Sequence, residues 1–381
     1  MAARKPDPEV SERRCPAQVL IDVYSGLGLR VGEGPDAARR AEAAGFSALW
    51  TIEAAREPFL PLALAAEHTE RLELGTAVAV AFARNPMVLA HAAHELNDYA
   101  HGRLLLGIGS QVRGHIERRF SSPWSRPAAR MREFILAMRA IWSCWNEGTR
   151  LCFDGEFYRH TLMTPMFDPG PSSAGPPRVL LAAVGTKMTG VAAGVADGLI
   201  AHPLTSVRYL REVTLPTVGA GLDAGGRRRD TFTVALPVMV ATGRDDEEMA
   251  TAERAVRQQI AFYASTPAYK TVLDLHGWSA IGERLTGLSK AGEWDAMAAE
   301  VDDDMVETFA VVASPAKVVP ELEARFSGLV DRVSLYAPYP VAAGMWETTL
   351  AEAAASRGPG TPGTTGAPGK RGPGGGDLDE R

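Results

Sequence analysis

A glycine followed by a Thr-Lys pair stands between an apolar run and a helical segment. The stretch 179–202 reads VLLAAVGTKMTGVAAGVADGLIAH, so Gly185 ends a predicted strand and Thr186, Lys187 and Met188 open a predicted helix. The first amides of a helix can donate to an anion, and the helix dipole favours negative charge there. Glycine lets the backbone approach a ligand closely. The pattern predicts a site for a single phosphate, and the alternative is an ordinary strand–helix turn.

Two other glycine clusters have the spacing of a dinucleotide-binding turn only in part. Gly26-Leu-Gly28 and Gly107-Ile-Gly109 both lack the third glycine of the GxGxxG pattern. That third glycine allows close packing of the helix against its strand. The sequence therefore does not favour a Rossmann-type site at either cluster.

The potential metal ligands are scattered along the chain. His91, His94 and Glu95 do not form the HExxH pattern of a zinc site. The three cysteines form no CxxC pair; they are Cys15, Cys144 and Cys152. We expect no metal site, and we expect free thiols in a reducing, cytoplasmic compartment.

Composition excludes several classes of protein. The chain has 381 residues and a formal net charge of −6, without an apolar run long enough to span a membrane. Its first residues have no apolar segment typical of a signal peptide. The lack of a long basic block argues against a nucleic-acid partner. We expect residues 1–15 to be loose and the Gly/Pro-rich range 353–381 to form a disordered tail, because such a composition has little to bury.

Between these ends, short apolar runs alternate with helical patterns. Continuous apolar runs are typical of parallel strands covered on both faces. The expected strands are 19–24, 47–53, 72–80, 103–110, 178–185, 198–202, 232–243 and 333–339. Eight such units predict an α/β fold, a (β/α)₈ TIM barrel over residues 16–345, and a doubly wound open sheet is the alternative.

Local signals set several boundaries in this barrel. Asp36 is the expected N-cap of a first helix that stops at Gly45, and Pro86 is expected in the first turn of a later helix. Two insertions interrupt the rhythm, a hairpin with a proline-rich loop over 151–177 and a polar helical segment over 266–309. Both are candidates to cap the barrel mouth.

The carboxyl ends of the strands, where such barrels bind ligands, are mostly apolar or small. The positions concerned are 24–25, 53, 77–81, 109–111, 185–188, 202, 241–243 and 336–339. They contain no Ser-His-Asp set, paired carboxylate or lysine that would indicate hydrolysis or Schiff-base chemistry. An apolar pocket with few acids favours a flat ring cofactor that carries its own chemistry.

Four motifs in the same order resemble those of a known family. They are GFSALWTIE, LELGTAVAVAFARNP, GRLLLGIGS and AAVGTKMTGVAAGVADG. The chain resembles the bacterial luciferase-like superfamily from about residue 19 to 339, and within it the branch of F420-dependent oxidoreductases. The alternative within this family is an FMN-dependent monooxygenase.

The resemblance implies where a cofactor would bind. In such enzymes a bulge after the third strand, often with a non-prolyl cis peptide, supports the flavin-type ring, and this maps onto Ala77 and Val78. Gly109 and Gln111, at the end of the fourth strand, are expected to contact the cofactor as well. The cofactor phosphate is expected on residues 185–188, the same turn that the helix-terminus argument selects.

The resemblance also implies an acid at the end of the second strand. Several F420-dependent relatives have an acid followed by histidine there, whereas this chain has Glu53 followed by Ala54. Glu53 is the first candidate catalytic residue, as a hydrogen-bonding group or proton shuttle. His115 is the second candidate; the alternative is that it caps or packs a helix.

The expected function is therefore an oxidoreductase that transfers a hydride between deazaflavin coenzyme F420 and a small organic substrate. One alternative is an FMN-dependent luciferase-like monooxygenase that uses O₂. Another is a non-catalytic cofactor-binding barrel, which the replacement of the expected histidine by Ala54 keeps open. We expect a small-molecule substrate, no membrane or nucleic-acid partner, and a homo-oligomer, a dimer, because such barrels often pair through exposed helices.

Overall fold

The computed structural model describes residues 19–26 and 28–356. The loose N-terminus expected over 1–15, including Cys15, lies outside the described residues, and so does the expected tail from residue 357 onward. The last helix continues to Ser356, so the first positions of the range 353–381 are helical. Within the described residues, no helix combines the length and apolar character needed to cross a membrane.

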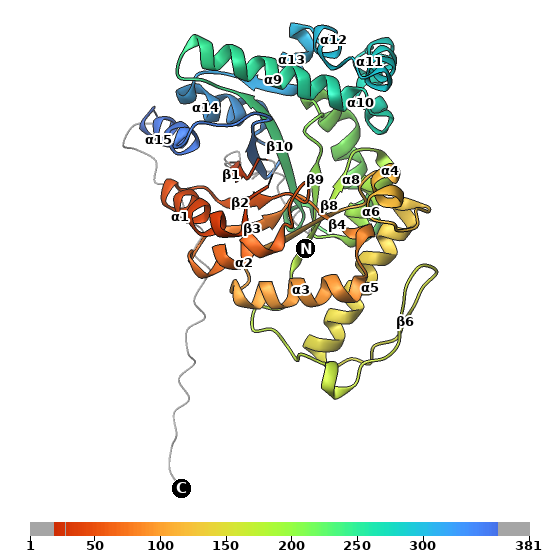
Figure 1. Cartoon of the computed structure of the whole chain (residues 1–381). Helices are drawn as coiled ribbons and strands as arrows, with labels where there is room; N and C mark the ends of the chain where they lie inside the picture. Colours follow the sequence, from red (N-terminus) through yellow and green to blue (C-terminus); the bar gives the residue numbers. More distant parts are fainter. Residues whose placement is uncertain (1–18, 27, 357–381) are drawn as a thin grey trace, which may run out of the picture.

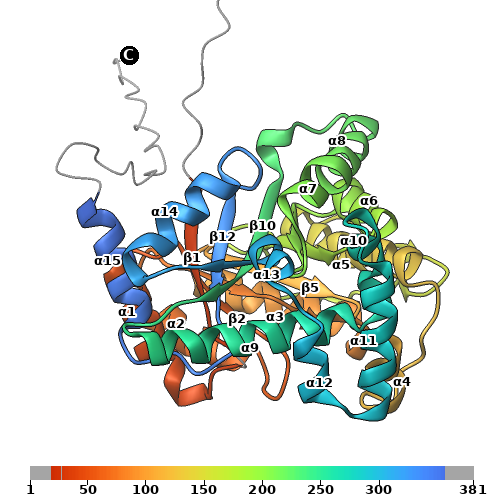
Figure 2. The same ribbon diagram turned by 90° about the horizontal axis from the view of Figure 1, so that it is seen from above.

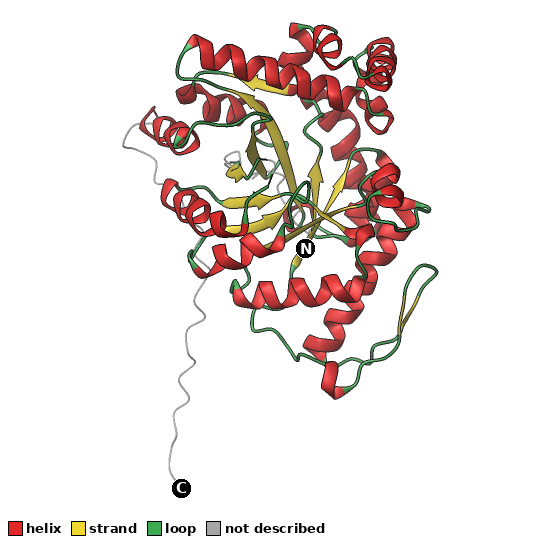
Figure 3. Ribbon diagram, viewed as in Figure 1, coloured by secondary structure: helices red, strands yellow, loops and turns green. Residues whose placement is uncertain are grey.

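Eight parallel strands close into a barrel that helices surround (Figures 1 and 3). Their order around the barrel is β1-β2-β3-β5-β8-β9-β10-β12, and β12 pairs with β1 to close it. The strands are β1 (Leu20–Tyr24), β2 (Ala48–Thr51), β3 (Glu73–Thr76), β5 (Leu104–Gly109), β8 (Arg178–Ala183), β9 (Gly198–Ala201), β10 (Thr233–Ala241) and β12 (Arg332–Tyr336). Two short strands extend the sheet: β4 (Ala79–Val80) pairs with β5 and β11 (Ala310–Val312) with β10. The TIM barrel expected from the sequence is confirmed.

Helices follow most strands and cover the outside of the barrel. They are α1 (Gly34–Ala44), α2 (Phe59–Glu67), α3 (Pro86–Tyr99), α4 (Arg113–Arg118), α5 (Pro127–Glu147), α6 (Thr186–Val195), α7 (Val207–Tyr209), α8 (Leu215–Ala224), α9 (Asp246–Ala264), α14 (Pro315–Phe326) and α15 (Met345–Ser356). A π-helical segment, η4 (Leu210–Thr214), joins α7 to α8. Figure 2 shows α15 beside α1 and α14, with which it packs.

The helix boundaries agree with the local signals except at one end. Pro86 opens α3 behind the N-cap Asn85, and Gly45 ends α1 with a left-handed φ of 93°. The prediction that Asp36 is the N-cap of α1 is wrong. A 3₁₀ turn, η1 (Val31–Glu33), leads directly into the helix, so Asp36 lies inside its first turn and binds Arg39.

The bottom of the barrel interior is closed by a buried polar cluster. Arg332 on β12 donates from Nε and Nη2 to Asp22 on β1 at 2.7 and 2.9 Å. Trp50 on β2 donates from Nε1 to the same carboxylate at 2.8 Å. Arg332 also pairs with Glu73 on β3 at 2.8 Å. Trp50 is thus a buried packing residue. Because the cluster fills this end of the barrel, only the opposite end is open to a ligand.

The two insertions lie in different places. The segment 151–177 forms the hairpin β6 (Phe153–Asp154) and β7 (Arg159–His160), which projects beside α5 in Figure 1. Glu133 on α5 accepts from the backbone amides of Phe157 and Tyr158, which fixes the hairpin to the outside of the barrel.

The second insertion, 266–309, is helical. Its elements are η6 (Pro267–Tyr269), α10 (Lys270–Leu275), α11 (Ser279–Ala291), α12 (Trp294–Ala299) and α13 (Asp303–Phe309). Its first residues reach the barrel mouth, where Ala268 and Tyr269 line a cavity.

Candidate active site

A cavity of about 390 Å³ lies at the carboxyl ends of the barrel strands. Every barrel strand contributes to its lining: β10 contributes Pro237 from its middle, and the other strands contribute residues at or just after their carboxyl ends. The lining residues that the argument below uses are Tyr24, Glu53, Ala77, Val78, Gly109, Gln111, Gly185, Met188, His202, Tyr263, Tyr269 and Tyr336. Seven of the ten predicted site residues line this cavity: Glu53, Ala77, Val78, Gly109, Gln111, Gly185 and Met188.

The bulge after β3 forms one wall of this cavity. The peptide bond between Ala77 and Val78 is cis, as the sequence resemblance leads one to expect. Tyr24 donates from its hydroxyl to the Ala77 carbonyl oxygen at 2.5 Å. A Cβ atom on Gly109 would lie 2.8 Å from Val78 Cγ2, so only glycine lets the bulge approach β5 this closely. The Gly107-Ile-Gly109 cluster therefore serves the packing of strands.

Glu53 lines the cavity, but its carboxylate is already bound. Oε2 accepts from the Val80 amide at 2.7 Å and from Arg84 Nη1 at 2.5 Å. Arg84 also donates to the Val80 carbonyl oxygen at 3.1 Å. These contacts connect the end of β2 to the segment after the cis peptide, so Arg84 has a structural role here.

The second candidate catalytic residue, His115, lies outside this cavity. His115 is exposed on α4 and is not among the residues that line the cavity. Gln111, four residues earlier, does line it, with a left-handed φ of 59°. Its Oε1 accepts from the Val112 amide at 3.0 Å. The loop after β5 thus turns Gln111 toward the cavity while α4 carries His115 away.

The histidine that lines the cavity is His202, which follows β9. Its Nδ1 accepts from the Leu204 amide at 3.0 Å. Its ring stacks on Tyr269 with 4.0 Å between centroids and meets the edge of Tyr263 at 4.6 Å. Burial lowers the pKa of His202 from 6.5 to about 3, so the ring is neutral and carries its proton on Nε2.

Tyrosines surround this histidine. Tyr263 and Tyr336 share a hydrogen bond of 3.2 Å between their hydroxyls, and Tyr24 meets the edge of the Tyr336 ring at 5.4 Å. Burial raises the pKa of Tyr269 to about 12 and that of Tyr24 above its ordinary range. The hydroxyls therefore remain protonated at neutral pH, and each can donate a hydrogen bond.

The turn after β8 connects the cavity to a second space. Gly185 is the N-cap of α6, and it lines both the cavity and an open groove of about 1000 Å³. Met188 also lines both, whereas Thr186 and Lys187 line the groove alone. Arg126, at the start of α5, lies in the same groove. Lys187, Arg126 and the first amides of α6 lie where the cavity opens, which suits a ligand with an apolar ring and an anionic tail. Asp274 also lines the groove, and its carboxylate binds Lys270 and Ser279.

Sequence reasoning did not select His202, Tyr263 and Tyr269 as site residues. His202 was among the predicted strand ends, and that position was its only signal. The two tyrosines come from the end of α9 and from the second insertion, so their approach to the cavity depends on tertiary packing.

The chain belongs to the luciferase-like monooxygenase family, which it matches over residues 17–332. It is 54% identical over 304 residues to an uncharacterized protein of Mycobacterium tuberculosis, covering 80% of this chain and 89% of that protein. It is 28% identical over 300 residues to an F420-dependent glucose-6-phosphate dehydrogenase of Intrasporangium calvum, covering 74% and 82%. The structure of the coenzyme F420-dependent tetrahydromethanopterin reductase of Methanopyrus kandleri has the same fold, with a TM-score of 0.72 at 20% identity, over 88% of this chain and 98% of that one.

Proposed function

We propose that this chain is an F420-dependent oxidoreductase that transfers a hydride between deazaflavin coenzyme F420 and a small organic substrate. The observation that carries the proposal is the junction at Gly185 and Met188, which line both an apolar cavity and an open groove. The 28% identity to an F420-dependent dehydrogenase supports the choice of cofactor. Coenzyme F420 has a flat ring and an anionic tail, and these two spaces match its two parts.

The residues divide between the two parts of the cofactor. The ring fits the cavity between the Ala77–Val78 bulge and Gly109. The phosphate fits the amides at the start of α6, with Lys187 beside them. Arg126 lies further along the groove, where it can meet the remaining negative charge of the tail, although Glu156 already pairs with it.

The cofactor, when bound, supplies or accepts the hydride. The chain positions the substrate and donates a hydrogen bond to its reacting oxygen. His202 is the proposed hydrogen-bond donor to the reacting oxygen, because its neutral ring lines the cavity and carries its proton on Nε2. A neutral imidazole can donate a hydrogen bond to a carbonyl oxygen on which negative charge develops. The stacked Tyr269 and the edge of Tyr263 hold the ring in place.

Glu53 takes a positioning role in this proposal. Its carboxylate binds the Val80 amide and Arg84, and both contacts fix the segment that follows the cis peptide. It therefore shapes the wall against which the ring would lie. His115 has no role in the chemistry, because it is exposed on α4.

The rival function is an FMN-dependent monooxygenase, and the family to which the chain belongs favours it as a second candidate. Separate titrations of the apoprotein with F420 and with FMN, followed by fluorescence, distinguish the two. The proposal predicts tight binding of F420 and weak binding of FMN. Tight FMN binding with no response to F420 would select the monooxygenase. Binding of F420 without hydride exchange across a panel of donors and acceptors would favour a non-catalytic barrel.

A further inference from the structure

Within the described chain, no positively charged side chain lines the candidate active-site cavity. The ionisable residues of its lining are Glu53, His202, Tyr24, Tyr263, Tyr269 and Tyr336. Arg84 pairs with the Glu53 carboxylate, and the His202 ring is neutral at pH 7 because burial lowers its pKa to about 3. Lys187 and Arg126 lie outside the cavity, in the groove proposed for the cofactor tail. An anionic group that left water for this cavity would therefore find no cation there.

Two groups in the cavity have a hydrogen-bond donor to spare. His202 Nδ1 accepts from the Leu204 amide, so the proton is on Nε2, which has no partner within the described residues. Tyr263 and Tyr336 share one hydrogen bond of 3.2 Å between their hydroxyls, and this bond uses only one of their two hydroxyl protons. Spare donors suit an uncharged oxygen acceptor, such as that of a ketone or an alcohol.

The size of the cavity limits what can bind beside the cofactor. Pockets for small ligands have volumes of about 300–1,000 Å³. This cavity has about 390 Å³, and the proposed deazaflavin ring would take part of it. Ile200 of β9 and Pro237 of β10 give the lining apolar surface. The remaining space fits a compact molecule with an apolar body.

On the basis of the proposed function, we infer that the substrate is a compact, uncharged alcohol with an apolar body, or the carbonyl compound formed from it. Its oxygen accepts from His202 Nε2 or from the spare tyrosine hydroxyl. In the direction of oxidation, the hydrogen on the alcohol carbon leaves with both electrons to the oxidised coenzyme, and the hydroxyl hydrogen leaves as a proton to water. A C=O bond forms, and the two electrons lost by the alcohol are those that reduce the coenzyme. Substrates with a carboxylate, a phosphate or an ammonium group are excluded, because the lining offers neither a cation nor a carboxylate free of its own partner.

Three 4-substituted cyclohexanols serve as matched probes of charge. At pH 7, 4-methylcyclohexanol is uncharged, 4-hydroxycyclohexanecarboxylate is an anion and 4-aminocyclohexanol is a cation. Each is titrated by calorimetry into the chain loaded with reduced F420, to which an alcohol cannot pass a hydride. The uncharged probe should bind more than about tenfold more tightly than either charged probe, because a charge would lose its hydration without a partner. With oxidised F420, the uncharged probe should also bleach the coenzyme absorbance fastest.

The same titrations separate this inference from the proposed function. If F420 itself does not bind, the proposed function fails. If F420 binds but a charged probe binds as tightly as the uncharged one, or no probe binds, the substrate class is wrong and the choice of cofactor stands.

Two variants in the second insertion locate the probe. Ala268 is exposed and lines the cavity, whereas Ala291 on α11 is exposed and does not. Ala268→Arg places a cation at the cavity mouth and should reduce the preference for 4-methylcyclohexanol over the carboxylate by at least about threefold. Ala291→Arg should leave this preference unchanged. An equal effect of the two variants, or none from either, would overturn the inference.

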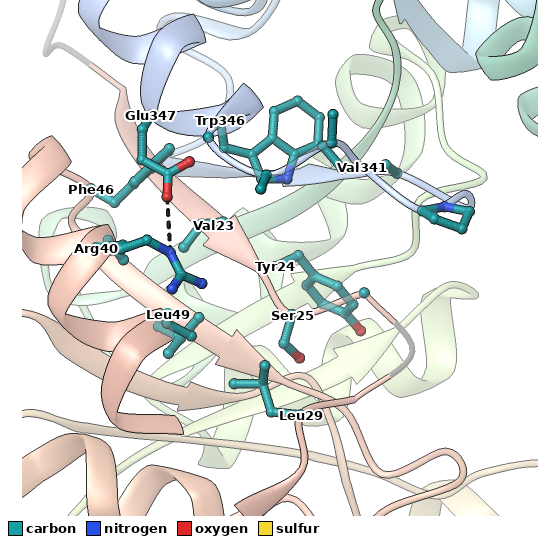
Figure 4. A pocket seen from close by; sticks show the side chains of 18 of the residues that line it. Val23, Tyr24, Ser25, Leu29, Arg40, Phe46, Leu49, Val341, Trp346 and Glu347 are labelled. Atoms are coloured by element: carbon teal, nitrogen blue, oxygen red, sulfur yellow. Dashed lines mark ion pairs between the residues drawn. The ribbon is translucent and has the colours of Figure 1, made fainter. Parts of the chain in front are cut away.

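A larger cavity, of about 660 Å³, is the alternative place for an apolar probe. It lies between β1, β2, α1 and α15, where Arg40 Nε and Glu347 Oε1 form an ion pair at 3.3 Å (Figure 4). Ala37 on α1 lines this larger cavity and not the candidate active site. Ala37→Trp fills it, so the affinity for 4-methylcyclohexanol should stay within about twofold of the wild type. A loss of binding in Ala37→Trp with unchanged F420 affinity would place the probe in the larger cavity and overturn the inference.

Discussion

Glu53 and Arg84 form an ion pair that is nearly buried, with side-chain exposures of 10% and 18% and 2.5 Å between Oε2 and Nη1. The pair joins the end of β2 to the segment after the cis peptide, because Glu53 also accepts from the Val80 amide. A carboxylate with two such donors is a structural anchor. Its position at the cavity wall explains how an acid at this strand end can shape the site without taking part in proton transfer.

Glu53→Ala should lower the free energy of unfolding by about 3 kcal/mol, because it leaves the Arg84 guanidinium partly buried without its main partner. Urea unfolding measures this loss. Glu117→Ala, which breaks an exposed pair with Arg113 on α4, is the control and should change stability by less than about 0.5 kcal/mol. If Glu53→Ala unfolds like this control, the pair is not an anchor.

Lys187→Ala should weaken cofactor binding by about 1–2 kcal/mol, and the loss should shrink as salt is raised. The physical reason is the loss of a positive charge beside the free amides of α6. Lys317→Ala provides a matched control, since Lys317 is an exposed lysine in the first turn of α14. Fluorescence titrations at two salt concentrations measure the effect. An unchanged affinity with reduced stability would mean that the turn is purely structural.

His202 should make the fold sensitive to acid. Burial lowers its pKa to about 3, so below pH 6.5 the unfolded chain takes up a proton here and the folded chain does not. The free energy of unfolding should then fall with pH, by about 2 kcal/mol from this residue between pH 7 and pH 5. His202→Gln should lose about that much less over the same interval in urea unfolding. His115→Gln, which replaces an exposed histidine, is the control. The prediction is contradicted if the free energy of unfolding of His202→Gln falls between pH 7 and pH 5 as much as that of the wild type.

Asp22→Asn should destabilise the barrel by about 3–4 kcal/mol, because the buried Arg332 guanidinium would lose the negative charge of Asp22 and keep only that of Glu73. The Asp22 and Arg332 side chains are 1% and 2% exposed. Asp36→Asn, which weakens the exposed pair with Arg39, should cost less than about 0.5 kcal/mol. Thermal or urea unfolding compares the two variants. Since the cluster lies at the closed end of the barrel, any folded Asp22→Asn protein should bind the cofactor like the wild type, and a selective loss of binding would contradict this assignment.

Most of the fold could be predicted from local sequence patterns. The eight apolar runs became the eight barrel strands, and Gly185 became the N-cap of α6, because both depend on residues adjacent in the sequence. The cis peptide at Ala77–Val78 was located by resemblance and could not be located by propensity. The prediction that Asp36 is the N-cap of α1 was wrong because the 3₁₀ turn before α1 starts the helix earlier than the pattern indicates.

The candidate site was less predictable, because its decisive contacts join distant segments. Arg84 reaches Glu53 across 31 positions, and between His202 and Tyr269 lie the helices α7, α8 and α9 and the strand β10. No local pattern reports such contacts. His115 follows Gln111 by four positions, yet Gln111 lines the cavity and His115 is exposed on α4.

The most direct test of the account is a crystal structure of the protein with coenzyme F420 bound. The account predicts the deazaflavin ring in the cavity against Ala77, Val78 and Gly109, with the phosphate at the amides of Thr186, Lys187 and Met188. A ring lodged outside this cavity, or a phosphate held away from the start of α6, would contradict it.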